Sequence, residues 1–553
     1  MKKYISVLLA IVMLFTLMAP VASAGDFEKL PIIYIRGNGE NIVYPDGTRV
    51  PARIEDLSLG GDEGLDKDVI VETAVNILKP FILEGMPFDK WDNYGRAIYD
   101  ELSPLFTDAG LDYDGNPTND TGVAQADLDE ALDISNTAGP FSTNSEYHFR
   151  YDWRLSPYDH VKRLHQYILN IMDATDKQQV TLYARCLGGS LLMAYLKEYG
   201  HLGHIKNVVF SDVLSNESTV ISKAFSGKIE FDAKLVERYA GQLDFCGRIG
   251  QGIGFVFSDA LNEIVVKSMD LFNQVYVTDA ALDTVEALYA KLYKALIPAV
   301  CHATGLATQV NYWTCVAEED MDEALDLLFG KEGSELRTKY KGLIDKIELY
   351  REKLTSNMDG FYDFLDEQGI HYGFIGKFGF LNAPFTEDAD LISDSLVSLT
   401  HATYGATTAP VGKTLSEDYI AKRVAEGNGK YISADKQVDL TTARSPETTW
   451  VIKNAHHNII NQYIPLIKAF LNGTNETVDT LTQGNNYFVF SYDTNSYSVM
   501  TEENAVDYEF MTRATENPTV STRLAALMRF FTMIFDYLTR IFKGTFSFSD
   551  ILG

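Results

Sequence analysis

The amino-acid sequence predicts an α/β fold, in which a mostly parallel sheet is flanked by helices. Apolar, β-prone segments at residues 147–151, 180–185 and 205–211 alternate with helix-forming segments. Strands joined in this order through helices pair in parallel and have right-handed crossovers. The chain has 553 residues, of which 46% are hydrophobic, so it can form one large domain with insertions or two domains.

The N-terminus predicts a secreted or otherwise extracytoplasmic protein. Residues 1–24 combine Lys2 and Lys3, an apolar run and the small residues Ala22-Ser23-Ala24. This three-part pattern is typical of a signal peptide that is cleaved after Ala24; an uncleaved membrane anchor is the alternative.

The charge balance excludes some partners. With 47 basic and 77 acidic residues the formal net charge is −30. We therefore expect no nucleic-acid partner, and no electrostatic attachment of the whole body to anionic lipid. The four cysteines include Cys186; the other three could form one disulfide and leave one thiol.

We expect the N-terminal part of the core over residues 25–225. Its first strand, at residues 30–35, runs into the tight turn Gly37-Asn38-Gly39. An acidic loop at residues 112–129 lacks the EF-hand spacing, so a solvated loop is favoured over a calcium site. No metal and no cofactor is expected. Strands and helices then alternate up to the strand at 205–211.

The C-terminal half divides by composition into four segments. Residues 226–365 are helix-forming without strand alternation, which predicts a large helical cap or lid. The core resumes over residues 366–475, with strands at 371–379 and 448–453, the latter expected to be the final strand of the core. An accessory hairpin is predicted within 476–520. Within 521–553, apolar residues at helical spacing over 522–546, flanked by Arg and Lys, predict a helix that either lies on a membrane or docks on the protein itself.

The segment around Cys186 predicts a nucleophile elbow. An apolar strand ends at this residue and passes directly into a helix-forming segment. The positions two before and two after the nucleophile of such an elbow must be small, and Ala184 and Gly188 meet that requirement. At the first turn of a helix the Cys186 thiolate is expected to be stabilised by the helix dipole, by an imidazolium and by Arg185. The alternative is an inert, small apolar residue.

The chain order supplies partners for this nucleophile. On an α/β-hydrolase sheet, the acid and then the histidine follow the nucleophile. Asp394 follows the strand at 371–379 and is preferred as the acid over Asp435. His457 follows the strand at 448–453 and is preferred as the base, with the adjacent His456 as the alternative.

Several of these motifs resemble the lecithin–cholesterol acyltransferase-like α/β-hydrolases, which include lysosomal phospholipase A2. The resemblance is carried by the first strand with Arg36-Gly37, by Tyr151-Asp152-Trp153-Arg154, by the elbow, by Asp394-Ser395-Leu396-Val397 and by the histidine. It implies a secreted lipid hydrolase or acyltransferase, and oxyanion donors at the amides of Leu187 and of Asn38 or Gly39. The usual His-Ser pair of the elbow is Arg185-Cys186 here.

Together these features predict a secreted α/β-hydrolase that cleaves or transfers acyl esters of lipids through Cys186, His457 and Asp394. The alternative is a catalytically inactive protein on the same scaffold, which binds lipid or acts at a cell surface.

Overall fold

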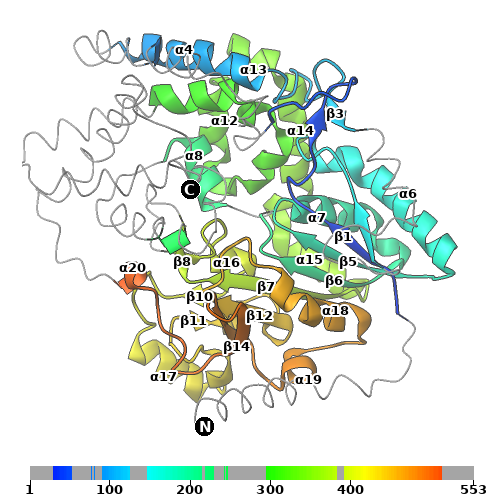
Figure 1. Ribbon diagram of the computed structural model, residues 1–553, viewed down its shortest axis with the longest axis vertical. Helices are drawn as coiled ribbons and strands as arrows, with labels where there is room; N and C mark the ends of the chain where they lie inside the picture. Colours follow the sequence, from blue (N-terminus) through cyan, green and yellow to red (C-terminus); the bar gives the residue numbers. More distant parts are fainter. Residues whose placement is uncertain are drawn as a thin grey trace, which may run out of the picture.

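A computed structural model describes residues 29–52, 76–77, 80, 90–124, 146–214, 218–228, 242, 245–246, 294–382 and 391–512. Its centre is an eight-stranded sheet with the order β14-β13-β12-β7-β6-β5-β1-β4 (Figure 1). The strands are β1 (Ile32–Ile35), β4 (Glu146–Phe149), β5 (Val180–Arg185), β6 (Ile205–Ser211), β7 (His371–Phe378), β12 (Thr449–Lys453), β13 (Tyr487–Ser491) and β14 (Ser496–Val499).

Every neighbouring pair in this sheet is parallel except β13 with β14. The predicted α/β fold is therefore confirmed, and the architecture is compatible with an α/β-hydrolase fold. Both faces of the sheet are largely buried, so most strand residues are apolar. The edge strand β14 is the exception, because Ser496 and Ser498 are exposed.

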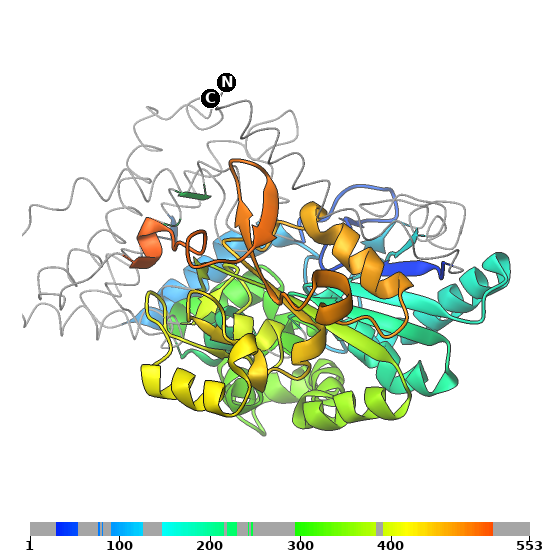
Figure 2. The ribbon, with the colours of Figure 1, turned by 90° about the horizontal axis from the view of Figure 1, so that it is seen from below.

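Helices cover the two faces of the sheet. On one face, Leu182 and Phe210 pack with α6 (Pro157–Thr175), α7 (Gly188–Tyr199) and α15 (Met358–Glu367). On the other face, Tyr183 and Val209 pack with α18 (Ile464–Asn472). Figure 2 shows α15 and α18 on opposite sides of the sheet. The result is a three-layer molecule.

The sheet extends further than predicted. β12 is not its final strand, because β13 pairs with it in parallel and β14 then returns antiparallel. The predicted hairpin is thus present, but it continues the main sheet. Phe488 and Phe490 of β13 bury against the face covered by α18, which gives this pairing its hydrophobic contacts.

The described part of the predicted cap, residues 226–228, 242, 245–246 and 294–365, is largely helical. It contains α12 (Met321–Phe329), α13 (Glu335–Lys339), α14 (Lys341–Lys353) and a run of 3-10 turns that ends in η7 (Val310–Cys315). We call residues 294–354 the helical layer. Its helix α12 packs on α8 (Thr219–Ser226) and lies next to α4 (Trp91–Leu102) in Figure 1. The last helix of the predicted range, α15, instead packs on the sheet, where Tyr362 meets Phe210 and Phe374.

The remaining described elements are short. Three two-stranded sheets pair β2 (Ile42–Val43) with β3 (Gly122–Val123), β8 (Phe380–Leu381) with β9 (Ile392–Ser393), and β10 (Thr407–Thr408) with β11 (Val438–Asp439). The other helices are α16 (Leu399–Ala402), α17 (Glu417–Ala425), α19 (Val478–Thr482) and α20 (Glu509–Thr512).

The predicted signal peptide at residues 1–24 and the predicted amphipathic helix at 522–546 lie outside the described residues. Within the described ranges, none of the helices has the length and hydropathy needed to cross a bilayer.

Candidate active site

The elbow brings Cys186 to the end of β5 in a strained backbone conformation. Its φ of 54° lies in the left-handed region, which non-glycine residues rarely adopt. Three main-chain hydrogen bonds hold it there. The Cys186 amide donates to the Ser211 carbonyl at 3.3 Å, and the Cys186 carbonyl accepts from the amides of Gly189 and Leu214, both at 3.1 Å. Strain kept in place by such bonds is typical of a functional position.

Small residues let the elbow approach β1 closely. A Cβ atom on Gly188 would lie 2.4 Å from the Ile35 carbonyl oxygen, a distance that no side chain could occupy. A Cβ atom on Gly37 would lie 3.4 Å from Cys186 Sγ and 3.2 Å from the Leu187 nitrogen. The turn that follows β1 therefore lies directly against the thiol.

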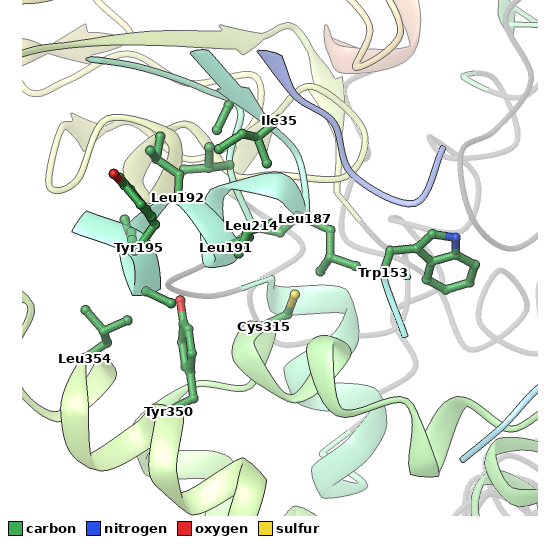
Figure 3. Close-up of a cluster of buried hydrophobic side chains, with 14 of the residues drawn as sticks. Ile35, Trp153, Leu187, Leu191, Leu192, Tyr195, Leu214, Cys315, Tyr350 and Leu354 are labelled. Carbon is green, nitrogen blue, oxygen red and sulfur yellow. The ribbon is translucent and has the colours of Figure 1, made fainter. Parts of the chain in front are cut away.

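The first helical turn after the elbow is buried between the sheet and the helical layer. Leu187, Leu191 and Leu192 are at most 1% exposed. Figure 3 shows them with Ile35 of β1 on one side and Cys315, Tyr350 and Leu354 of the helical layer on the other. This packing fixes the start of α7 and with it the direction of the Leu187 amide.

Asp394 and His457 are brought together although 63 positions separate them in sequence. His457 Nδ1 lies 2.7 Å from Asp394 Oδ2, and the His457 amide donates to the Asp394 carbonyl at 2.9 Å. The other carboxylate oxygen, Oδ1, accepts from the amides of Leu396 at 3.0 Å and Val397 at 2.8 Å. Both oxygens of the Asp394 carboxylate thus accept hydrogen bonds. Nδ1 of His457 therefore carries a proton, which it donates to Asp394 Oδ2.

The two alternatives from the sequence have other partners. Asp435 accepts from Lys453 Nζ at 2.6 Å and from Ser433 Oγ at 2.5 Å. His456 Nε2 lies 2.9 Å from Ser395 Oγ, and its Nδ1 accepts from the Asn458 amide at 3.3 Å. The structure therefore pairs Asp394 with His457 and places Asp435 in a separate ion pair.

The His457 imidazole is buried, and its Nε2 atom has no hydrogen-bond partner among the described residues. Within that same part of the chain, no hydrogen bond joins Cys186 Sγ to this nitrogen. Nε2 is the atom that could take a proton from a nucleophile, since Nδ1 is occupied by Asp394. Catalytic hydrogen bonds are often long before substrate binds and shorten in the complex.

Burial keeps the thiol and the imidazole neutral. Burial raises the pKa of Cys186 above its ordinary 9.0, although the Arg185 charge and a bond from the Leu187 amide oppose the change. Burial, with Arg185 and Lys377, holds the pKa of His457 well below 6.5. The thiolate expected from the sequence is therefore wrong for this state, because desolvation outweighs the nearby positive charges.

The predicted oxyanion donors lie in two segments, the elbow and the turn that follows β1. The Leu187 amide is within hydrogen-bonding reach of Cys186 Sγ. The Gly39 amide donates to the Gly37 carbonyl at 2.9 Å, so it is already used within the turn. Asn38 Nδ2 donates to the hydroxyl of Tyr312 in the helical layer at 3.4 Å. Of the two alternatives in this turn, Gly39 is the one whose amide already has a main-chain acceptor.

The Tyr151-Asp152-Trp153-Arg154 motif supports the same turn. The Tyr151 hydroxyl donates to the Arg36 carbonyl at 2.9 Å, and Trp153 Nε1 donates to the Glu40 carbonyl at 3.0 Å. Arg154 binds both oxygens of Asp152, at 3.0 and 2.8 Å, in a fork that fixes the motif. The motif thus holds both ends of the segment from Arg36 to Glu40.

The described part of the acidic loop, residues 112–124, is bound by a lysine side chain. Lys346 Nζ occupies the loop, at 2.9 Å from the Gly115 carbonyl and 3.2 Å from Asn116 Oδ1. Across the described ranges no cluster of three or more His, Cys, Asp or Glu side chains could hold a metal ion. All four cysteines are free thiols, so the disulfide that the sequence allowed is not formed in this structure.

Two buried charged residues near His457, Lys377 and Asp212, were not predicted from the sequence. Lys377 Nζ lies 3.1 Å from Asp212 Oδ2, and both side chains are fully buried. The signal that could have identified them is a lysine within the largely apolar segment at 371–379, because a buried charge needs a buried partner.

The chain matches no family model and no curated protein. A solved structure described as "The crystal structure of Tle4-Tli4 complex" is similar to it, with a TM-score of 0.27 and 12% sequence identity over 92% of this chain and 99% of the other. A likeness at that score carries no argument about the site, which has to be interpreted from its own geometry.

Proposed function

We propose that the protein is a secreted carboxylic ester hydrolase or O-acyltransferase of the α/β-hydrolase type, with Cys186 as nucleophile, His457 as base and Asp394 as the residue that orients the base. The observation that carries the proposal is the 2.7 Å contact between His457 Nδ1 and Asp394 Oδ2, made at the strand ends next to the strained elbow. Nucleophile, base and orienting acid are the three parts that such chemistry needs.

The reaction starts from a neutral thiol and a neutral imidazole. His457 Nε2 takes the thiol proton as Cys186 Sγ bonds to the acyl carbonyl carbon, and the carbonyl oxygen becomes an oxyanion. The imidazolium then gives its proton to the leaving alcohol as the C–O bond breaks, which leaves a thioester on Cys186. Water or a second alcohol, deprotonated by His457, releases the acyl group and restores the thiol.

The amides of Leu187 and Asn38 are the proposed oxyanion donors. Each donor of this kind contributes about 3 kcal/mol to the stabilisation of the transition state. Leu187 is fixed by its buried helix, and the turn at Asn38 is held by Tyr151 and Trp153. The same donors would stabilise both tetrahedral intermediates.

The proposed substrate is a lipid acyl ester at a membrane surface. The support is the resemblance of the sequence motifs to the lecithin–cholesterol acyltransferase-like enzymes. Membrane contact is assigned to residues 522–546, and secretion to the signal peptide. Liposome flotation of the whole chain and of a chain that ends at residue 521 tests the contact, and equal flotation of both would reject it.

Turnover of a p-nitrophenyl ester panel by wild type, Cys186→Ala and Cys186→Ser tests the catalytic proposal. We expect release of p-nitrophenol by wild type, none above background by the alanine variant, and a mass increase of one acyl group on the Cys186 peptide. Equal turnover by wild type and the alanine variant would reject the nucleophile.

A second candidate is a lipid-binding protein without turnover. It is favoured by one observation, that His457 Nε2 and Cys186 are not hydrogen-bonded. In that case wild type and Cys186→Ala would retain a fluorescent lipid equally, and neither would form an acyl-cysteine.

A further inference from the structure

Two fully buried charges lie beneath the proposed catalytic histidine and take no part in the chemistry above. Lys377 lies near the C-terminal end of strand β7, and Asp212 follows β6; both are 0% exposed, with Nζ and Oδ2 3.1 Å apart. Removing two charges from water is costly and is offset only by good geometry and further hydrogen bonds. The remaining bonds of Lys377 therefore indicate what the pair does.

Lys377 Nζ donates to three main-chain carbonyls of the loop that follows β12. The distances are 3.3 Å to His456, 2.5 Å to His457 and 3.1 Å to Ile459. Arg185 donates to the same His457 carbonyl. Two cations, the fully buried Lys377 and the partly buried Arg185, thus converge on the carbonyl oxygen of His457, whose side chain is the proposed base.

The same residues are joined to the elbow. Arg185 directly precedes Cys186 on β5, and Asp212 directly follows Ser211, whose carbonyl accepts the Cys186 amide at 3.3 Å. Lys377, Asp212 and Arg185 therefore connect three neighbouring strands to the histidine loop. The main chain of His457 makes one further hydrogen bond, in which its amide donates to the Asp394 carbonyl.

We propose that Arg185, Asp212 and Lys377, the His457 anchor, are positioning residues that set the separation between the His457 imidazole and the Cys186 thiol by holding the main chain of His457. The inference rests on the proposed function. A buried ion pair is by itself weak evidence for stability, so its presence does not explain why Lys377 and Asp212 are there. Their bonds to the loop after β12 indicate a positioning role instead.

The test compares Lys377→Met with wild type in p-nitrophenyl ester hydrolysis. Methionine keeps most of the length of the side chain and removes every side-chain donor. A misplacement of about 1 Å can cost about 100-fold in rate, so we expect kcat to fall by about 10- to 100-fold while KM stays within about twofold. Lys377→Arg keeps donors and should retain more activity than Lys377→Met.

The matched control is Lys223→Met. Lys223 is 6% exposed and pairs with Asp320 at 3.2 Å between α8 and the start of α12. Both methionine variants break a buried lysine–aspartate pair, so both should lower the thermal unfolding midpoint. A kcat loss in Lys377→Met no larger than in Lys223→Met would overturn the anchor.

The double variant Asp212→Asn/Lys377→Met removes both charges of the buried pair. The hydrogen bonds from Lys377 to the loop carbonyls are still absent in it, so recovery of wild-type kcat would also overturn the anchor.

A readout that does not need turnover separates this inference from the proposed function. The low-field NMR signal of the His457 Nδ1 proton, bound to Asp394, should persist in Lys223→Met and broaden or vanish in Lys377→Met. If wild type has no Cys186-dependent turnover, the proposed function fails, but the NMR signal still tests whether the His457 anchor positions His457. An unchanged signal in Lys377→Met would reject that positioning role. If Lys377→Met does not fold, Asp212→Asn is measured in the same way.

Discussion

At the residue scale, the chemistry depends on the protonation of Cys186 and His457. A reactive cysteine usually owes its reactivity to a lowered pKa and a stable thiolate. Here burial raises the pKa of the thiol and lowers that of the imidazole, so both are neutral near pH 7. In the proposed reaction, proton transfer to His457 then accompanies the attack by Cys186, as it does for a serine nucleophile. In this respect Cys186 and His457 resemble a serine–histidine pair, in which the hydroxyl and the imidazole are both neutral before the reaction.

The neutral thiol with its raised pKa predicts how Cys186 reacts with iodoacetamide. We expect the alkylation rate at Cys186 to rise with an inflection above pH 9, with no plateau between pH 6 and 8. Peptide mass spectrometry measures the rate at each cysteine. Burial raises the pKa of Cys246 and of Cys301 to about 12, so these thiols are internal controls that should remain unlabelled. A plateau below pH 7 would indicate a thiolate–imidazolium pair instead.

The choice of acid gives a second prediction at this scale. Asp394→Asn removes the acceptor that keeps the proton on His457 Nδ1, so kcat should fall by on the order of 10³- to 10⁴-fold. Asp435→Asn should leave kcat within about twofold of wild type and lower stability, because Asp435 pairs with Lys453. Ester hydrolysis and denaturant unfolding of both variants check this, and the reverse order of kcat values would assign the acid to Asp435.

At the scale of elements, the turn after β1 depends on a motif more than 100 positions away in sequence. Tyr151 and Trp153 hold the carbonyls of Arg36 and Glu40, and a proposed oxyanion donor, Asn38, lies between them. The helical layer adds the Tyr312 hydroxyl from the other side. The position of this donor therefore depends on contacts with two separate elements.

Trp153→Phe tests the support of this turn. It removes the 3.0 Å bond to Glu40, and we expect kcat to fall about tenfold and the free energy of unfolding to fall by about 1–2 kcal/mol. Trp450→Phe is the matched control, since Trp450 is also fully buried and its Nε1 donates to Thr482 Oγ1 at 3.1 Å. Equal kcat losses in the two variants would mean that the motif only stabilises the fold.

At the scale of the whole molecule, buried neutral histidines couple folding to pH. Burial lowers the pKa of His148 to about 4 and of His456 to about 3, and it lowers that of His457 strongly. The unfolded chain binds protons to these groups below their ordinary pKa of 6.5, and the folded chain does not. The stability they contribute is therefore present above pH 6.5 and is lost as pH falls from there toward 3 to 4.

This linkage predicts acid destabilisation at an unusually high pH. Between pH 7 and 5 the free energy of unfolding should fall by on the order of 2 kcal/mol for each of these histidines. Denaturant unfolding at several pH values measures the slope, and His148→Gln should reduce it. A free energy of unfolding that stays constant from pH 7 to 5 would contradict the buried neutral state.

Much of the fold and of the site is predictable from sequence. The elbow follows from Ala184, Cys186 and Gly188, because a crowded corner accepts only small neighbours on a short local segment. Asp394 and His457 follow from chain order, since the carboxyl ends of parallel strands meet at one edge of the sheet. The extension of the sheet by β13 and β14 was not predicted, because the pattern of a hairpin does not say which strand it joins.

The sequence by itself determined the α/β class, the elbow, and Asp394 and His457 as the preferred partners of Cys186, because local patterns and chain order suffice for these. Only the tertiary structure decided the pairing of Asp394 with His457, the neutral protonation state and the bonds of Lys377 to the histidine loop. The physical reason is that pKa values and ion pairs depend on burial and on distances between residues far apart in sequence. Lys377 was visible as a charge in an apolar strand, but its partners at Asp212 and at the His457 carbonyl exist only once β5, β6, β7 and the loop after β12 are packed together.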